Sequence, residues 1–316
     1  MRRLDRILAV VDPTVETQSA VAKAACLARA SGATLELFIC DFDPALSGRP
    51  FADTAAVRML REEFLDERGE YLEDLADELR AGGLNVETHV HWDNPLHRGI
   101  LARIRESAPD LVVKDTHFHS LLRRTLFTNT DWNLIRTSPA PLLLAKSAGW
   151  PAHPRLLAAV DPGHLADKPA ALDHDILDFA ALLAQFVDGE VDAVHAFFPA
   201  ALLALTTGMG GLPLGGETAV DEIVAAERGR IEEGVRKLAA AHSLPAGRVH
   251  LVQGSAAEAL PRAVVDLRAD LVLMGAVSRS RLEELFIGST AERVLDRLPV
   301  DVLVVKAPDF AEQMPP

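Results

Sequence analysis

Two kinds of segment, which differ in the spacing of their hydrophobic positions, alternate along the chain. Short apolar runs such as ILAVV at 7–11 are followed by longer segments in which apolar residues recur every three or four positions. Short apolar runs are typical of buried strands, and the longer period is typical of amphipathic helices. This order predicts βαβ units, in which a parallel sheet lies between two layers of helices.

The same unit occurs twice, head to tail. ILAVVDP at 7–13 returns as LLAAVDP at 156–162, and SPAPLLLAK, which ends at Lys146, is matched by LPVDVLVVK, which ends at Lys306. A repeat of domain length defines the organisation of the whole chain. We therefore predict one domain at residues 1–147, a Gly- and Pro-containing linker at 148–153, and a second domain at 154–310.

Each copy is expected to contribute five strands. These strands are predicted at 6–11, 34–41, 85–91, 111–114 and 141–146, and again at 155–160, 190–197, 249–253, 271–274 and 300–306. A glycine-rich segment at 198–218 lengthens the second copy and is expected to form a mobile loop. Such a loop serves either as a lid over a site or as a surface insertion without function.

Composition and charge exclude several classes of protein. The chain has 316 residues, of which 49% are hydrophobic and 25% charged, as in ordinary globular proteins of two domains. Its net charge of -14 argues against nucleic acid and anionic membranes as partners. No signal peptide or membrane span is apparent, so we expect a cytoplasmic protein. Cys26 and Cys40 form no C-x-x-C pair and are expected to be buried free thiols.

Candidate ligand chemistry appears after the fourth strand of the second copy. That strand ends at Met274 and Gly275, and Gly288, Ser289 and Thr290 open a predicted helix. Ligands of open parallel sheets bind outside the carboxyl ends of the strands, where the strand order reverses. Free N–H groups, glycine and hydroxyl side chains at such a place suit a polyphosphate. The same tripeptide is also an ordinary helix cap, so it does not by itself distinguish the two roles.

The residues around this segment resemble the universal stress protein family. An Asp after the apolar first strand, a long second helix, and G-x2-S-x9-G-S-T from Gly275 to Thr290 carry the resemblance; nucleotide-binding members of the family have G-x2-G-x9-G-[S/T]. It covers both halves and implies two doubly wound α/β domains, each with a five-stranded parallel sheet of order 3-2-1-4-5. Because the family's domains associate through their last strands, 141–146 and 300–306 are expected to pair as an intrachain pseudo-dimer, with a homodimer as a further alternative.

The resemblance also implies an adenine-nucleotide site, for ATP or AMP with Mg, in the second copy. Ser278 stands where the family has its second glycine, and its side chain can crowd the approach of a ligand to the backbone. Arg279 either donates to a phosphate or is an exposed surface residue. Asp161 and Glu258 are candidates for holding Mg²⁺. The positions carried over are Val160, Asp161, Ala196, Gly254, Met274, Gly275, Ser278, Arg279, Gly288, Ser289 and Thr290.

The first copy departs from this pattern. It keeps Asp12 but has no glycine between Lys114 and Trp132, so we expect it to be degenerate for nucleotide. It is instead rich in histidine, and His91, His117 and His119 are candidates for a Zn(II) site if the loops after the third and fourth strands converge. The alternative is that these histidines are solvated or bonded to backbone.

Three functions remain open from the sequence. The chain lacks the Walker, H-E-x-x-H and G-x-S-x-G motifs, so at most weak ATPase activity is expected. The leading hypothesis is a stress-response protein that senses adenine nucleotide in its second domain. The alternatives are a scaffold that acts through protein contacts, and a binder of metal or apolar ligands that uses the histidines and the segment 198–218.

Overall fold

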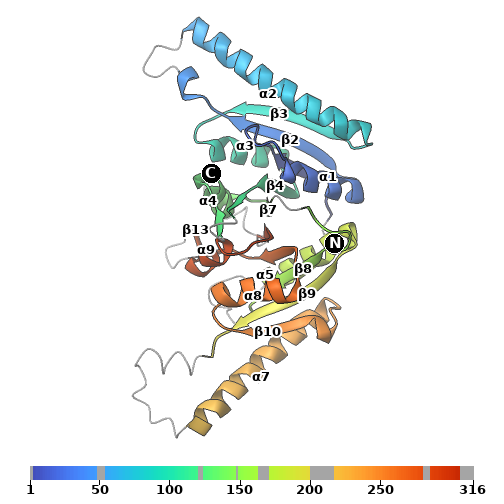
Figure 1. Ribbon diagram of the computed structural model, residues 1–316, viewed down its shortest axis with the longest axis vertical. Helices are drawn as coiled ribbons and strands as arrows, with labels where there is room; N and C mark the ends of the chain where they lie inside the picture. Colours follow the sequence, from blue (N-terminus) through green and yellow to red (C-terminus); the bar gives the residue numbers. More distant parts are fainter. Residues whose placement is uncertain are drawn as a thin grey trace.

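The computed structural model describes residues 3–47, 54–119, 124–146, 149–162, 171–199, 217–279 and 285–306. One long sheet runs through the molecule, with helices on both faces and α2 and α7 at its two ends (Figure 1). Most of the glycine-rich segment predicted at 198–218 lies outside the described residues.

The first half contains the elements expected of one βαβ-rich domain, together with a small hairpin. Its elements are β1 (Arg6–Val10), α1 (Ser19–Ser31), β2 (Thr34–Asp41), α2 (Ala55–Ala81), β3 (Val86–Trp92), α3 (Leu96–Ser107), β4 (Leu111–Asp115), β5 (His117–His119), β6 (Arg124–Leu126), α4 (Asn129–Thr137) and β7 (Leu142–Ala145).

The second half repeats this order. Its elements are β8 (Arg155–Ala159), α5 (Leu172–Val187), β9 (Glu190–Phe197), α7 (Glu217–Ala241), β10 (Val249–Gln253), α8 (Ala256–Leu267), β11 (Leu271–Met274), β12 (Val277–Arg279), β13 (Leu285–Ile287), α9 (Ser289–Leu295) and β14 (Asp301–Val304).

The ten main strands form a single sheet in the order β10-β9-β8-β11-β14-β7-β4-β1-β2-β3. Each half therefore has the predicted order 3-2-1-4-5, and all pairs of main-sheet strands within a half are parallel. The two halves join through β7 and β14, which run antiparallel with Leu143 opposite Leu303. The predicted pairing of the two last strands is confirmed. It removes two open strand edges from solvent.

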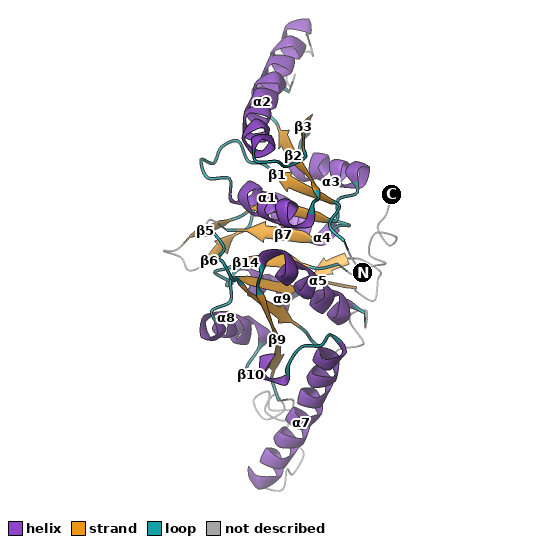
Figure 2. Cartoon of the chain, turned by 90° about the vertical axis from the view of Figure 1, so that its right-hand side faces the viewer, coloured by secondary structure: helices purple, strands orange, loops and turns teal. Residues whose placement is uncertain are grey.

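Two layers of helices bury both faces of the sheet (Figure 2). On β1, Ile7 and Ala9 pack on the side of α1, while Leu8 and Val10 pack on the side of α3 and α4. Strands buried on both faces need apolar residues at consecutive positions, which explains the unbroken hydrophobic runs in the sequence. Near the centre, α1 packs against α5, so the two halves are in contact through helices as well as through strands.

Two features differ from the sequence-based prediction. The segments after β4 and β11 form the antiparallel hairpins β5–β6 and β12–β13, where only loops were expected. Their strands have three residues each, too few to show an alternating pattern. The expectation of two buried thiols is wrong for Cys26, which is exposed on α1, whereas Cys40 is buried.

A buried polar network crosses the junction between the halves. The Lys23 Nζ lies 2.7 Å from the carboxylate of Asp301, whose oxygens also accept the Lys146 backbone N–H at 2.8 Å and the Trp150 Nε1–H at 2.6 Å. Desolvation outweighs the nearby ammonium and raises the pKa of Asp301. One carboxylate of the second half is thus held by a cation of the first half, the end of β7 and the connecting segment.

The lysine that follows the last strand of each half donates a hydrogen bond to the other half. Lys146, after β7, donates from Nζ to the carbonyl of Leu298 at 2.8 Å, just beyond α9. Lys306, after β14, donates to the carbonyl of Ile135 in the last turn of α4. Each lysine therefore satisfies a carbonyl near the end of the other half's last helix. Burial lowers the pKa of Lys146 to about 8 and that of Lys306 to about 7.

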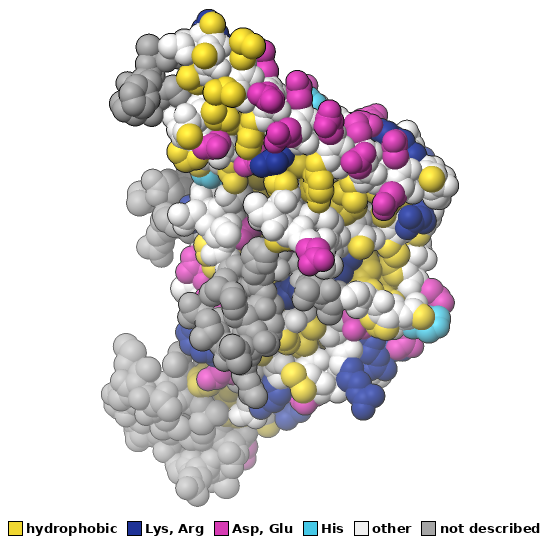
Figure 3. All heavy atoms as spheres, turned by 45° about the horizontal axis from the view of Figure 1, so that its top comes forward, with side chains coloured by type: hydrophobic (Ala, Val, Ile, Leu, Met, Phe, Trp, Pro, Cys, Tyr) yellow, Lys and Arg dark blue, Asp and Glu magenta, His cyan; other side chains and the backbone are white. Residues whose placement is uncertain are grey.

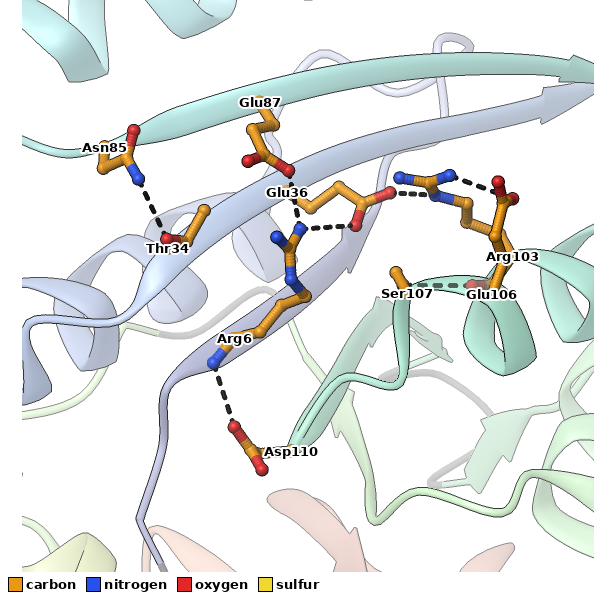
Figure 4. Close-up of polar contacts among 9 residues, drawn as sticks. All are labelled: Arg6, Thr34, Glu36, Asn85, Glu87, Arg103, Glu106, Ser107 and Asp110. Atoms are coloured by element: carbon orange, nitrogen blue, oxygen red, sulfur yellow. Dashed lines mark hydrogen bonds and ion pairs between the residues drawn. The ribbon is translucent and has the colours of Figure 1, made fainter.

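A second buried carboxylate lies near the amino ends of the strands of the first half (Figure 4). The Glu36 side chain on β2 is fully buried and is paired with Arg6 from β1, at 3.3 Å, and with Arg103 from α3. The Arg6 guanidinium also reaches Glu87 on β3 at 2.6 Å. Buried charges need such partners, and this set links three neighbouring strands and a helix.

Much of the negative charge of the protein lies on the outside. Acidic side chains follow one another along α2, which buries only Leu72 and Ala76 (Figure 3). Within the described residues, no helix is long and apolar enough to cross a membrane.

We predict that Asp301→Asn destabilises the protein by about 3 to 5 kcal/mol, because it leaves Lys23 buried without its counter-charge. Urea denaturation of the full chain measures this loss. The control is Asp77→Asn, which removes an exposed partner of Arg80 and should cost less than about 1 kcal/mol. Equal losses in the two variants would contradict the role assigned to the junction.

We also predict that the free energy of unfolding rises with pH between about pH 7 and 10. The folded-state pKa of Lys306 lies near 7, below the ordinary lysine value, so the unfolded chain binds more protons across this window. Lys306→Met should lower the slope by about 1 kcal/mol per pH unit, measured by urea denaturation at several pH values. An unchanged slope would show that the buried ammonium is not destabilised by its surroundings.

Candidate nucleotide site

The candidate site lies at the carboxyl ends of β8 and β11, where the strand order of the second half reverses. The Val160 N–H extends the parallel ladder to the carbonyl of Val194 at 3.0 Å. The ring of His195, buried on β9, places Nδ1 2.9 Å from the carbonyl oxygen of Val160. A buried imidazole therefore supports the backbone on which the predicted ligand-binding residues begin.

Both the backbone and the side chain of Asp161 contact neighbouring polar residues. Its N–H donates to Oδ1 of the buried Asp173 at 3.0 Å, and its own Oδ1 lies 3.7 Å from His195 Nδ1. The Asp161 side chain is 40% exposed, so it remains accessible from solvent. This position combines a fixed backbone with an accessible carboxylate.

Gly275 follows β11 and lies against the first residue of α5. A Cβ at Gly275 would approach Leu172 Cδ2 to 2.6 Å, a distance that forbids any other residue unless Leu172 moves. The glycine is therefore required in part for packing inside the protein. Any ligand group that contacts Gly275 from the same side must displace the Leu172 side chain.

The predicted phosphate loop is a hairpin followed by a helix. Ser278 and Arg279 lie on β12, opposite Phe286 and Leu285 of β13, and the side chains of this hairpin strand lie outside what the structure describes. Ser278 is not among the described residues with positive φ, so its backbone does not require the family's glycine.

Gly288, at the start of α9, combines an internally satisfied backbone with open space. Its N–H donates to the Ala276 carbonyl at 3.2 Å, and no atom lies within 4 Å of where its Cβ would stand. Ser289 and Thr290 follow it and are both exposed.

The remaining predicted residues surround this region. Gly254 follows β10 with a φ of 136°, a conformation that requires glycine, and its N–H donates to the Phe197 carbonyl at 2.9 Å. Ala196 is half-buried at the end of β9, and Met274 is buried at the end of β11. Glu258 accepts a hydrogen bond from Ser255 at 2.8 Å, which lowers its pKa. The predicted residues thus follow four neighbouring strands at one end of the sheet.

The corresponding place in the first half is filled by charged side chains. Lys114 and Asp115 occupy the last two positions of β4, where the second half has Met274 and Gly275. Oδ1 of the buried Asp115 accepts the Ala20 N–H in the first turn of α1 at 2.9 Å. A carboxylate of the protein thereby takes a helix N–H of the kind that binds a phosphate in nucleotide sites.

A second carboxylate closes the first turn of α4. Thr128 and Asp131 form a capping box, and Oδ1 of the buried Asp131 lies 2.9 Å from Lys114 Nζ. Asp12, kept from the family pattern, accepts the Thr14 N–H and hydroxyl in a local turn. At this place, Lys114 is therefore paired with Asp131, and Asp115 and Asp12 each accept hydrogen bonds from the protein itself.

The proposed zinc site gains no support. Two strands, β1 and β2, separate β3, which carries His91, from β4, which leads to His117 and His119; at about 4.8 Å per strand they are about 14 Å apart. The side chains of His117 and His119 lie outside what the structure describes. Among the described residues, no group of three or more histidine, cysteine or acidic side chains is arranged to hold a metal.

Three residues of the candidate site were not predicted: Leu172, Asp173 and His195. Leu172 and Asp173 open α5 directly after a stretch whose helical start had no clear sequence signal, and their partners lie on other strands. His195 interrupts the apolar run of β9, and a polar residue inside a buried strand was the available signal.

Comparison with known proteins agrees with this architecture. The profile of the Universal stress protein family matches residues 3–146 and 155–306. Universal stress protein E of Escherichia coli strain K12 is 26% identical over 311 residues, covering 98% of this chain and 96% of the relative.

Solved structures resemble the whole chain as well. A protein of unknown function from Pseudomonas aeruginosa PAO1 has 27% identity and a TM-score of 0.72, with 98% and 95% of the two chains covered. A universal stress protein from Archaeoglobus fulgidus DSM 4304 shares the fold, with a TM-score of 0.65 at 17% identity and 96% and 99% coverage. With both halves matched by the family profile, the chain belongs to the universal stress protein family as a tandem, two-domain member.

Proposed function

We propose that this stress-response protein binds an adenine nucleotide, ATP or AMP, in its second domain and acts as a nucleotide-dependent regulator in the cytoplasm. The first domain, on this proposal, does not bind nucleotide and serves as the fixed partner of the pseudo-dimer. Activity as an enzyme is not part of the proposal.

The observation that carries the proposal is the difference between two equivalent places in the fold. In the first domain, Asp115 and Asp131 supply acceptors of the protein's own, and Lys114 pairs with one of them. The second domain has Met274 and Gly275 at the positions of Lys114 and Asp115, and it leaves open space beside Gly288. A phosphate bound in the first domain would meet two carboxylates, whereas in the second domain these charges are absent from the corresponding positions.

The geometry also suits the rest of a nucleotide. The half-buried Ala196 and the end of β8 offer an apolar surface for a base, and the accessible Asp161 carboxylate can accept hydrogen bonds from ribose hydroxyls. Because Asp173 and His195 hold the backbone around Asp161, this acceptor is positioned before the ligand arrives.

Nucleotide binding predicts a ligand-dependent rise in melting temperature. At a nucleotide concentration about one hundred times its Kd, the native state gains about 2.7 kcal/mol, which raises Tm by several degrees. Gly288→Val should abolish this rise, because a branched side chain fills the open space beside the helix start. Differential scanning fluorimetry with millimolar ATP and AMP, with and without Mg²⁺, measures the effect.

Gly247→Val is the matched control. Gly247 likewise has no atom within 4 Å of where a Cβ would stand, but it lies before β10, at the opposite end of the strands. This variant should keep the full nucleotide-dependent rise. If the wild-type protein shows no rise at millimolar nucleotide, the proposal fails and the scaffold function takes its place.

A further prediction concerns Leu172, which covers Gly275. Leu172→Ala should lower the stability of the free protein by about 2 to 5 kcal/mol, because a buried side chain is truncated. It should nevertheless strengthen nucleotide binding, since the ligand no longer has to displace the leucine. Isothermal titration calorimetry of the two proteins measures the ratio of Kd values; weaker binding by the variant would contradict a covering role.

A further inference from the structure

Two histidines join the start of α5 to the end of α7. His174 Nδ1 lies 2.8 Å from His242 Nε2, and the two ring centroids are 5.0 Å apart. The opposite nitrogen of His242, Nδ1, lies 2.9 Å from Oδ1 of Asp178, one helical turn after His174. The described residues thus contain a chain of three titratable groups, in the order Asp178, His242, His174.

This geometry limits how many protons the pair can carry. Only one hydrogen fits between two ring nitrogens at 2.8 Å, so one of them donates and the other accepts. The Asp178 carboxylate accepts from His242 Nδ1–H, and a first extra proton on the pair is stabilised by this negative charge. A second extra proton places two N–H groups and two positive charges face to face, and the contact must break.

The surrounding charges are already engaged or belong to the same helix. Asp173 and Asp175 flank His174 on α5. On the last turns of α7, Arg236 and Lys237 are paired with Glu232 and Glu233. On the other elements packed against α5, Lys23 of α1 is held by Asp301, and His195 of β9 lies 3.7 Å from Asp161. Arg155 of β8 pairs with Glu190 of β9, Glu190 and Asp192 of β9 pair with Arg248, and Arg29 lies in the last turn of α1.

We propose that His174 and His242 form a proton-sensitive latch, which holds the first turn of α5 against the end of α7 while a single hydrogen lies between the rings and opens when both rings are fully protonated. Imidazole is the side chain that ordinarily changes charge between about pH 5 and 8, so the latch responds to mild acidification. We name it the His174–His242 latch.

Three consecutive residues at the start of α5 connect the His174–His242 latch to the candidate site. Leu172 covers Gly275, Asp173 holds the Asp161 N–H, and His174 makes the latch contact. Opening the first turn of α5 therefore loosens two contacts of the candidate site at once. This consequence for nucleotide rests on the proposed function, whereas the latch itself is tested without nucleotide.

The first test follows the histidine rings of the full chain by NMR with ¹⁵N-labelled histidine between pH 4.5 and 8. Because only one hydrogen fits between the two rings, the response of the His242 signal to pH should depend on the presence of the His174 ring. In His174→Gln, which keeps a neutral hydrogen-bonding side chain, the His242 signal should therefore follow pH differently from that of the wild-type protein. Identical His242 titrations in the two proteins would overturn the latch.

The second test measures opening directly. Hydrogen-exchange protection factors of the first turn of α5 should fall at least tenfold between pH 7.5 and 5 in the wild-type protein. The double variant His174→Gln, His242→Gln should show no such fall. His153→Gln is the matched control, because it removes an exposed histidine that contacts Asp188 at the other end of α5. Its protection factors should change with pH as in the wild type, and an equal fall in the double variant would overturn the proposal.

Discussion

The antiparallel pairing of β7 with β14 is the contact on which the rest of the architecture depends. It converts two five-stranded sheets into one sheet of ten strands and buries the edge that each half would otherwise present to water. The buried Lys23–Asp301 pair lies at the same junction. A buried ion pair contributes little net stability compared with apolar packing, but its charges are tolerated in only one arrangement. The network therefore favours one relative placement of the halves.

Within this shared frame, the two halves have diverged in how they satisfy the polar groups at the carboxyl ends of their strands. The first half uses its own carboxylates, with Asp115 bonded to α1 and Asp131 capping α4. The second half has a glycine at the first of these positions and packs it against Leu172. The first arrangement is built from groups of the protein itself. The second depends on a single apolar side chain, which a ligand can move at smaller cost than a buried charge.

The fold could be predicted well from the sequence because two features agree: the repeat indicates two copies of one unit, and the apolar runs indicate the same five strands in each copy. The bounds of β2, β9, β10 and β11 agree with the prediction at both ends, since polar, glycine or proline residues lie at or close to the ends of each run. The hairpins were missed because three-residue strands carry no readable pattern.

The candidate site was predictable only in part. Motif residues are close together in the sequence, whereas the residues that contact them come from distant parts of the chain. Gly275 was recognised as a motif residue, yet its packing against Leu172 depends on how α5 crosses β11. The His174–His242 contact joins residues whose spacing belongs to no motif.

The buried Lys23–Asp301 network at the junction is not symmetric: its cation comes from the first half and its carboxylate from the second. This asymmetry determines how the two halves would pair if they were expressed as separate chains. Counting back from Lys146 and Lys306, the position of Asp301 is taken by Pro141 in the first half. Two copies of the first half would bring together two Lys23 ammonium groups with no acid, and two copies of the second would bring together two Asp301 carboxylates without Lys23. Separately expressed halves should therefore pair with each other rather than with themselves, because only the unlike pair places an ammonium group beside a carboxylate.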